Sequence, residues 1–202
     1  MEEWRELART VPGTLLRVAE GTIGLLGTLD SAHQALATLI RLALNLLRGD
    51  AAAVAINRDD VRDQPDARAT LDDARRALVR LRELHDTASQ VFLLCGTRLA
   101  TEANPDALWK TWARHHGETS RHGSRALESL RSAASHVRAS KDALLMVRSL
   151  PRQSPDWVAW VSAALNLLRR AVWAATKARL AARRMRDAVA VELEDASRIV
   201  NR

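Results

Sequence analysis

Three side chains near the middle of the chain have a spacing that could serve metal binding. His115, Glu118 and His122 are three and four residues apart, which would place them on one face of a continuous helix. Imidazole and carboxylate groups at such a spacing can bind zinc or iron. Gly117 and Gly123 lie in the same stretch, however, and they predict a kink or a break in the helix. We therefore assign no metal site and expect no cofactor.

Two arginine–histidine pairs could serve phosphate chemistry. Arg80 and His85, like Arg131 and His136, have four residues between them, a spacing similar to that of helical-bundle ribonucleases. Such pairs arise easily by chance, because 28 of the 31 basic residues are arginines. His85 also lies on an apolar stripe, which favours a core histidine. The sequence shows no phosphate loop or nucleophile elbow, so we expect no enzyme.

The elements that position these residues are long helices. Residues 65–103 carry a stripe whose spacing alternates between three and four residues, as in helices that pack along a left-handed seam. A second stripe runs through residues 105–150. The members of the two stripes are, in order, Leu71, Ala74, Leu78, Leu81, His85, Ala88, Phe92, Cys95 and Leu99, then Trp109, Trp112, His116, Thr119, Gly123, Ala126, Leu130, Ala133, Val137, Ser140, Leu144 and Val147. Cys95 is interpreted as a core residue, since a free cysteine behaves as a small hydrophobe.

Proline–aspartate pairs predict where three of the helices start. Proline suits the first helical position and an early aspartate complements the helix dipole. The pairs are Pro65-Asp66, Pro105-Asp106 and Pro155-Asp156, with Asn104 and Ser154 as N-cap residues for the last two. Together with the amphipathic helices in residues 1–50, they predict an all-α, elongated bundle of four to five helices. We expect residues 1–202 to form one domain, with long helices over 65–103, 105–150 and 155–200.

The first 50 residues predict a helix over 14–28 and another over 31–48, or one bent helix, with Gly49 as the C-cap. In residues 31–48 the apolar side chains cover an arc of roughly 200°, well above the ~100° stripe of an ordinary surface helix. A helix of this kind is either sandwiched between neighbours or immersed in an interface. The arc consists of Leu36, Leu39, Ile40, Ala43, Leu44, Leu46 and Leu47.

One hexapeptide occurs twice. The residues Ala-Leu-Asn-Leu-Leu-Arg stand at 43–48 and again at 164–169, late in an apolar run each time. The second copy belongs to the helix predicted over 155–200, which carries Trp157, Val161 and Leu168 on one side. Both copies favour surfaces for packing or for membranes over a catalytic cleft.

The charge is unevenly distributed. Residues 1–104 carry a net charge of −2, residues 105–150 carry +4, and residues 151–202 carry +5. The basic half could contact lipid headgroups, nucleic acid or an acidic protein. Stacking aromatics are not interleaved with the basic residues, which makes nucleic acid the weaker alternative. Acidic residues near the N-terminus argue against a secretory signal, and the uncharged runs are too short for a conventional transmembrane helix.

Four stretches together resemble the peroxisomal membrane-elongation proteins, the peroxin-eleven family. Residues 15–27 are similar to that family's early helix leading into Leu-Leu-Gly, and residues 39–50 to its Gly-Arg-Lys-Leu-Leu-Arg-Leu-Gly segment. Residues 135–150 resemble the helix that ends in a short polar loop, and residues 157–170 resemble the tryptophan-led helix that follows. The resemblance implies a non-enzymatic protein that inserts amphipathic helices into one leaflet, elongates the membrane, self-associates and recruits fission machinery.

These observations lead to one expectation and two alternatives. We expect an oligomeric protein on an organelle membrane, peroxisomal by the resemblance, whose apolar faces sit about 5–10 Å into the headgroup boundary. The alternatives are an accessory or scaffold subunit of a large assembly, such as a mitochondrial membrane complex, and a nucleic-acid-binding bundle. The expected membrane or partner face comprises Leu36, Ile40, Ala43, Leu47, Trp157, Val161 and Leu168. The expected contacts with an anionic surface are Arg41, Arg48, Arg179, Arg183 and Arg186.

Overall fold

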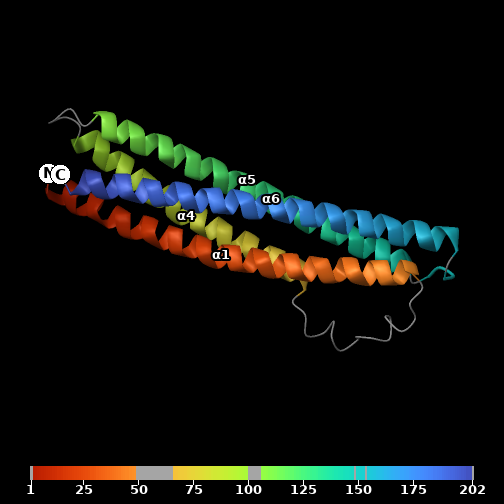
Figure 1. Cartoon of the computed structure of the whole chain (residues 1–202). Coiled ribbons are helices and arrows are strands. Elements are labelled where there is room, and N and C mark those ends of the chain that lie inside the picture. Colours follow the sequence, from red (N-terminus) through yellow and green to blue (C-terminus); the bar gives the residue numbers. More distant parts are fainter. Residues whose placement is uncertain (1, 49–65, 100–105, 148, 153, 202) are drawn as a thin grey trace. The chain divides into compact units, whose positions relative to one another are not determined.

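The protein is all-α. The computed structural model describes residues 2–48, 66–99, 106–147, 149–152 and 154–201. Four long helices, α1 (Glu2–Arg48), α4 (Ala67–Leu99), α5 (Asp106–Val147) and α6 (Pro155–Val200), account for nearly all of these residues, and the described part of the chain contains no strand (Figure 1). The predicted all-α bundle is thereby confirmed, with four helices.

The helices contribute to two compact units. Unit 1 consists of residues 1–26, 76–127 and 180–202, and unit 2 consists of residues 27–75 and 128–179. Every helix supplies one segment to each unit, so each unit contains segments of all four helices. The expectation of a single domain over 1–202 stays a prediction.

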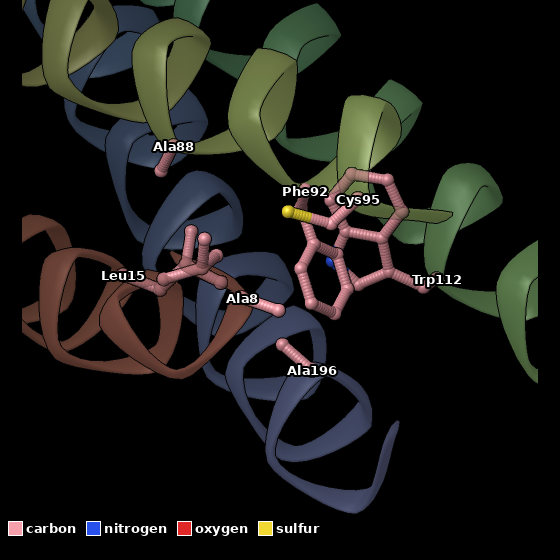
Figure 2. Close-up of a cluster of buried hydrophobic side chains, with 8 residues drawn as sticks. Ala8, Leu15, Ala88, Phe92, Cys95, Trp112 and Ala196 are labelled. Carbon is pink, nitrogen blue, oxygen red and sulfur yellow. The ribbon is translucent and has the colours of Figure 1, made fainter. Parts of the chain in front are cut away.

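The core of unit 1 is built around aromatic side chains from two helices. Phe92 of α4 meets the ring of Trp112 of α5 edge-on, with 4.8 Å between the ring centroids. Figure 2 shows these rings with Cys95 beside them and small side chains of α1 and α6 closing the cluster, which comprises Ala8, Val11, Leu15, Ala88, Phe92, Cys95, Trp112 and Ala196. Cys95 is completely buried in this cluster, which confirms its interpretation as a core residue, and burial raises the pKa of its thiol.

The predicted stripe of α4 is confirmed. From Leu71 to Cys95 every predicted member is buried. Leu99 is the exception, since its side chain lies outside the described part. The α5 stripe is buried at most of its positions from Trp112 to Ser140, and is half-buried at Trp109, His116, Leu144 and Val147. A repeat that alternates between three and four residues keeps one line of side chains facing the bundle interior, which is why the pattern alone located the core.

Of the two alternatives for the N-terminal region, the structure shows a single helix, and the break predicted in α5 is wrong. The N-terminal region is one helix from Glu2 to Arg48 with Pro12 inside it, so the chain does not break between residues 28 and 31. Helix α5 likewise continues through Gly117 and Gly123. At Gly123 a Cβ atom would lie 3.3 Å from the side chains of Arg82 and Met185, so this glycine permits close packing inside a regular helix. Tertiary packing offsets the helix-breaking tendency of glycine.

The helix starts follow the capping rules with one correction. At the start of α6, Pro155 is the first residue and the Ser154 hydroxyl accepts a hydrogen bond of 3.2 Å from the backbone N–H of Trp157, as predicted. At the start of α4, the Asp66 carboxylate accepts a 3.0 Å bond from the backbone N–H of Arg68. Asp66 is therefore the N-cap rather than a first-turn residue. The predictions on Gly49, Pro65, Asn104 and Pro105 lie outside the described residues.

Candidate functional site

The expected lipid- or partner-facing residues of α1 belong to unit 2. Leu36 and Ala43 are buried there, and Ile40 and Leu47 are half-buried. This segment of α1 lies against α6, where the His33 ring and the Thr176 hydroxyl are joined by a 2.9 Å hydrogen bond. Of the seven residues of the wide apolar arc, Leu36 and Ala43 are buried and the other five are half-buried. Leu36 and Ala43 therefore face the protein interior in this packed form, and the expectation that the arc meets lipid or a partner stays a prediction.

The expected face of α6 is also covered by protein. Val161 and Leu168 are buried, and Trp157 is 7% exposed. Both copies of the repeated hexapeptide fall in unit 2, at 43–48 and 164–169. Within each copy, the alanine is buried and the arginine is exposed. The repeat is thus a packing segment, in which the small first residue faces the interior and the arginine faces solvent.

The arginines expected to contact an anionic surface fall into two groups. Arg41, Arg48 and Arg183 are exposed. Arg179 is engaged within unit 2, where its Nε lies 2.7 Å from Oδ1 of Asp30 and its Nη2 donates to Oδ2 at 3.1 Å. Arg186 pairs with the adjacent Asp187 at 2.8 Å. The first group remains available for an anionic partner, whereas the other two guanidinium groups already contact carboxylates.

The spacing of His115, Glu118 and His122 does not create a shared site. His115 turns to α6, where its Nδ1 lies 2.7 Å from Oδ2 of Asp195. His122 is partly buried, and its pKa is lowered by desolvation and by the nearby charges of Arg125 and Arg184. His115 thus pairs with α6, while the charge of Glu118 acts on His122, and among the described residues the three side chains do not form a group that could hold one ion.

A different set of chemical groups meets inside unit 1. His85 of α4 and Glu192 of α6 are almost completely buried, at 1% and 0% exposure. Nε2 of His85 lies 2.8 Å from Oε2 of Glu192, a hydrogen-bond distance. From α5, Nδ1 of His116 lies 3.6 Å from the other carboxylate oxygen, Oε1. Two imidazoles thus approach one buried carboxylate from two sides.

We call His85, His116 and Glu192 the polar cluster. Its two imidazole rings continue the aromatic core. The His85 and His116 rings stack with centroids 4.9 Å apart, and His116 in turn stacks on Trp112 at 5.5 Å. The polar groups are therefore held by the same packing that forms the hydrophobic cluster. A bundle core rarely contains a charged group without a partner, because its desolvation is expensive.

The electrostatics of Glu192 reflect these neighbours. Burial alone raises the pKa of this carboxyl, but the two histidines favour its charged form and outweigh burial, so the net shift is downward. A distance of 3.6 Å is too long for a hydrogen bond, so the influence of His116 is electrostatic. Oε1 of Glu192 and Nδ1 of His116 are both buried without a hydrogen-bond partner among the described residues. The two unpartnered atoms face each other.

Sequence reasoning missed Glu192, although a signal was present. Met185, Val189, Glu192 and Ala196 follow a spacing of four, three and four residues, and all are buried. A carboxylate on such a stripe indicates a buried polar partner on another helix. Which helix supplies that partner is decided only when the segments pack.

Large apolar side chains remain exposed at the α5–α6 end of unit 2. Leu145 and Met146 lie in the last turn of α5, and Val158 and Trp160 lie in the first two turns of α6; each is 40–49% exposed. Five exposed basic residues belong to the same stretch, namely Arg138, Lys141, Arg152, Arg169 and Arg170. We call these nine residues the turn surface. Exposed apolar and cationic groups together are typical of an interaction surface.

Two further findings bear on function. Among the described residues, no helix combines the length and the apolar character needed to cross a bilayer. Comparisons with protein-family models, with curated proteins and with solved structures gave no match to this chain.

Proposed function

We propose that the protein is a non-enzymatic helical bundle that associates with an anionic membrane surface through the turn surface of unit 2. The observation that carries this proposal is the exposure of Leu145 and Met146 at the end of α5 and of Val158 and Trp160 at the start of α6. Indole prefers the half-wet boundary of a bilayer, and the exposed cations of the same two helices and the turn between them attract anionic headgroups. The proposal keeps the membrane function expected from the sequence and moves the contact from the α1 arc to the turn surface.

The arrangement of charge supports lipid as the partner. Among the described residues from 138 to 170, the five exposed cations outnumber the two exposed carboxylates, Asp142 and Asp156. A basic segment near an anionic leaflet gains about 1 kcal/mol for each lysine or arginine at the surface. Apolar side chains at the turn add shallow insertion to this attraction.

Vesicle flotation tests the proposal. The full-length chain is mixed with vesicles of neutral phosphatidylcholine or with vesicles containing 30% anionic phosphatidylglycerol, a mole fraction roughly like that of an acidic leaflet. We expect binding to the anionic vesicles only, reduced at least about tenfold by the double substitution V158S/W160S and weakened by salt. The matched control is I23S, which removes an apolar side chain of unit 1 that is even more exposed, at 61%. Unchanged binding by V158S/W160S would contradict the proposal.

A crosslinking experiment distinguishes lipid binding by the turn surface from lipid binding by the α1 arc. In a C95A background, the substitutions H33C and T176C introduce two cysteines that a short bis-maleimide can join, because the side chains of His33 and Thr176 meet between α1 and α6. If lipid binds the turn surface, the crosslinked protein floats as the uncrosslinked one does. Loss of flotation on crosslinking would show that unit 2 must open to use the arc. If the isolated chain binds no vesicles and self-associates, the scaffold-subunit alternative is favoured.

A further inference from the structure

We propose that His85, His116 and Glu192 form a binding site for one divalent transition-metal ion, such as Zn²⁺ or Fe²⁺. The three residues come from α4, α5 and α6, all within unit 1. One potential ligand atom from each side chain lies within 4.8 Å of the other two. The proposal is independent of membrane binding, which concerns unit 2.

The distances suit a small ion. Zinc binds imidazole nitrogen at about 2.0–2.1 Å and carboxylate oxygen at about 2.0–2.2 Å, so two ligand atoms of a tetrahedral site lie about 3.4 Å apart. Nδ1 of His116 and Oε1 of Glu192 are 3.6 Å apart, which already matches this separation. Nε2 of His85 lies 2.8 Å from the other carboxylate oxygen, Oε2, so binding an ion would exchange this hydrogen bond for a metal bond.

The unpartnered atoms point to the same conclusion. Nδ1 of His116 and Oε1 of Glu192 are buried and make no hydrogen bond within the described residues. Leaving a buried polar atom unpaired is unfavourable, and native structures contain few such atoms. An ion between the two atoms would satisfy both, with neutral imidazoles and a charged carboxylate as its ligands.

The ligand types select the class of metal. Two imidazoles and one carboxylate suit zinc, iron and similar ions, whereas calcium and magnesium prefer a full set of oxygen ligands. Three protein ligands leave at least one coordination position for water. When Nε2 of His85 binds the ion, its Nδ1 carries the proton and faces Oδ1 of Asp86 at 3.6 Å. A carboxylate at this position is the usual outer partner of a metal-bound histidine.

Metal titration of the tag-free, full-length chain tests the site. After treatment with a chelator, ZnCl₂ is added while binding is followed by calorimetry and thermal unfolding by circular dichroism. We expect one ion per chain and a Tm increase of about 5–10 °C when free zinc is a hundredfold above its Kd. Co²⁺ in place of zinc should give visible absorption bands characteristic of bound histidine and carboxylate.

Three variants locate the site. H116Q and E192Q each remove one ligand, and each should weaken zinc binding at least about a hundredfold and abolish the Tm increase. H115Q is the matched control, because it removes the neighbouring histidine that pairs with Asp195 and leaves the three ligands intact. H115Q should keep both the stoichiometry and the Tm increase, even if its metal-free Tm is lower.

The outcomes are decisive even if one variant folds poorly. His116 makes no hydrogen bond through Nδ1, so H116Q should retain the helical spectrum and can decide alone if E192Q unfolds. Absence of zinc binding by the wild-type chain would overturn the proposal. Zinc binding that is equal in H116Q and wild type would also overturn it, because the ion would then be bound elsewhere.

Discussion

Nε2 of His85 and Oε2 of Glu192 lie 2.8 Å apart inside unit 1, although 107 residues separate the two in the chain. The contact fixes the register of α4 against α6, because neither group can shift along its helix without leaving a buried polar atom unpaired. It also places the most polar feature of unit 1 directly beside its aromatic core.

Removing one partner of the His85–Glu192 pair should lower the free energy of unfolding far more than replacing both partners by apolar residues. E192A leaves the His85 ring without its acceptor and should lower the free energy of unfolding of the metal-free protein by about 3–5 kcal/mol. The double substitution H85L/E192L replaces both groups by apolar ones, and its effect should be near neutral or stabilising. Urea unfolding followed by circular dichroism measures both. An equal loss of free energy of unfolding in the single and the double variant would contradict this prediction, because the cost would then not come from leaving one buried polar group unpaired.

Two helical glycines should respond in opposite directions to alanine. At Gly96 a Cβ atom would lie 2.6 Å from the ring of Trp109, so G96A must displace that ring and should destabilise the protein by about 1–3 kcal/mol. At Gly117 nothing lies within 4 Å of the added atom, so G117A should stabilise α5 by about 0.5–1 kcal/mol. Thermal unfolding compares them, and destabilisation by G117A would mean that this position is not regular helix.

The two tryptophans Trp112 and Trp173 should differ in their contribution to stability. Trp112 is fully buried in the cluster of Figure 2, so W112A should lower the free energy of unfolding by about 3–5 kcal/mol. Trp173 is 62% exposed, and its visible contact is with the Lys177 ammonium, 3.4 Å above the ring centroid. W173A should therefore lower stability by about 1 kcal/mol or less. Similar losses in both variants would contradict the assignment of the core.

The stability of unit 1 should depend on pH through His122. Desolvation and the charges of Arg125 and Arg184 lower the pKa of this imidazole. Because the unfolded chain binds the proton more readily, the contribution of the neutral ring is present above the ordinary pKa of about 6.5 and is lost as the pH falls from there toward the folded-state pKa.

The variant H122Q removes that titration. Its free energy of unfolding should change less with pH than that of the wild type between about pH 6.5 and 5, and the two curves should run parallel above pH 7. Urea unfolding at several pH values measures the difference. Curves that stay parallel down to pH 5 would show that His122 titrates normally in the folded protein.

The sequence by itself determined the helices and their buried faces. The alternation of three and four residues from Leu71 to Cys95 identified the inner line of α4, and Ser154 with Pro155 identified the start of α6, because both depend on the periodicity and hydrogen bonding of a single helix. A local rule was wrong in α5, which continues through Gly117 and Gly123 although these glycines predicted a kink or a break. The sequence left open whether the first 48 residues form two helices or one, and the structure shows one helix that contains Pro12.

Only the tertiary structure decided which polar groups meet. His115, Glu118 and His122 had the spacing of a site, but His115 pairs with Asp195 of α6 instead, whereas His85, His116 and Glu192 share no local motif and come together from three helices. A helix pattern fixes the side on which a residue lies, but not which helix faces it or at what height. Those are set by the packing of whole helices, whose energy depends on contacts between residues far apart in the chain.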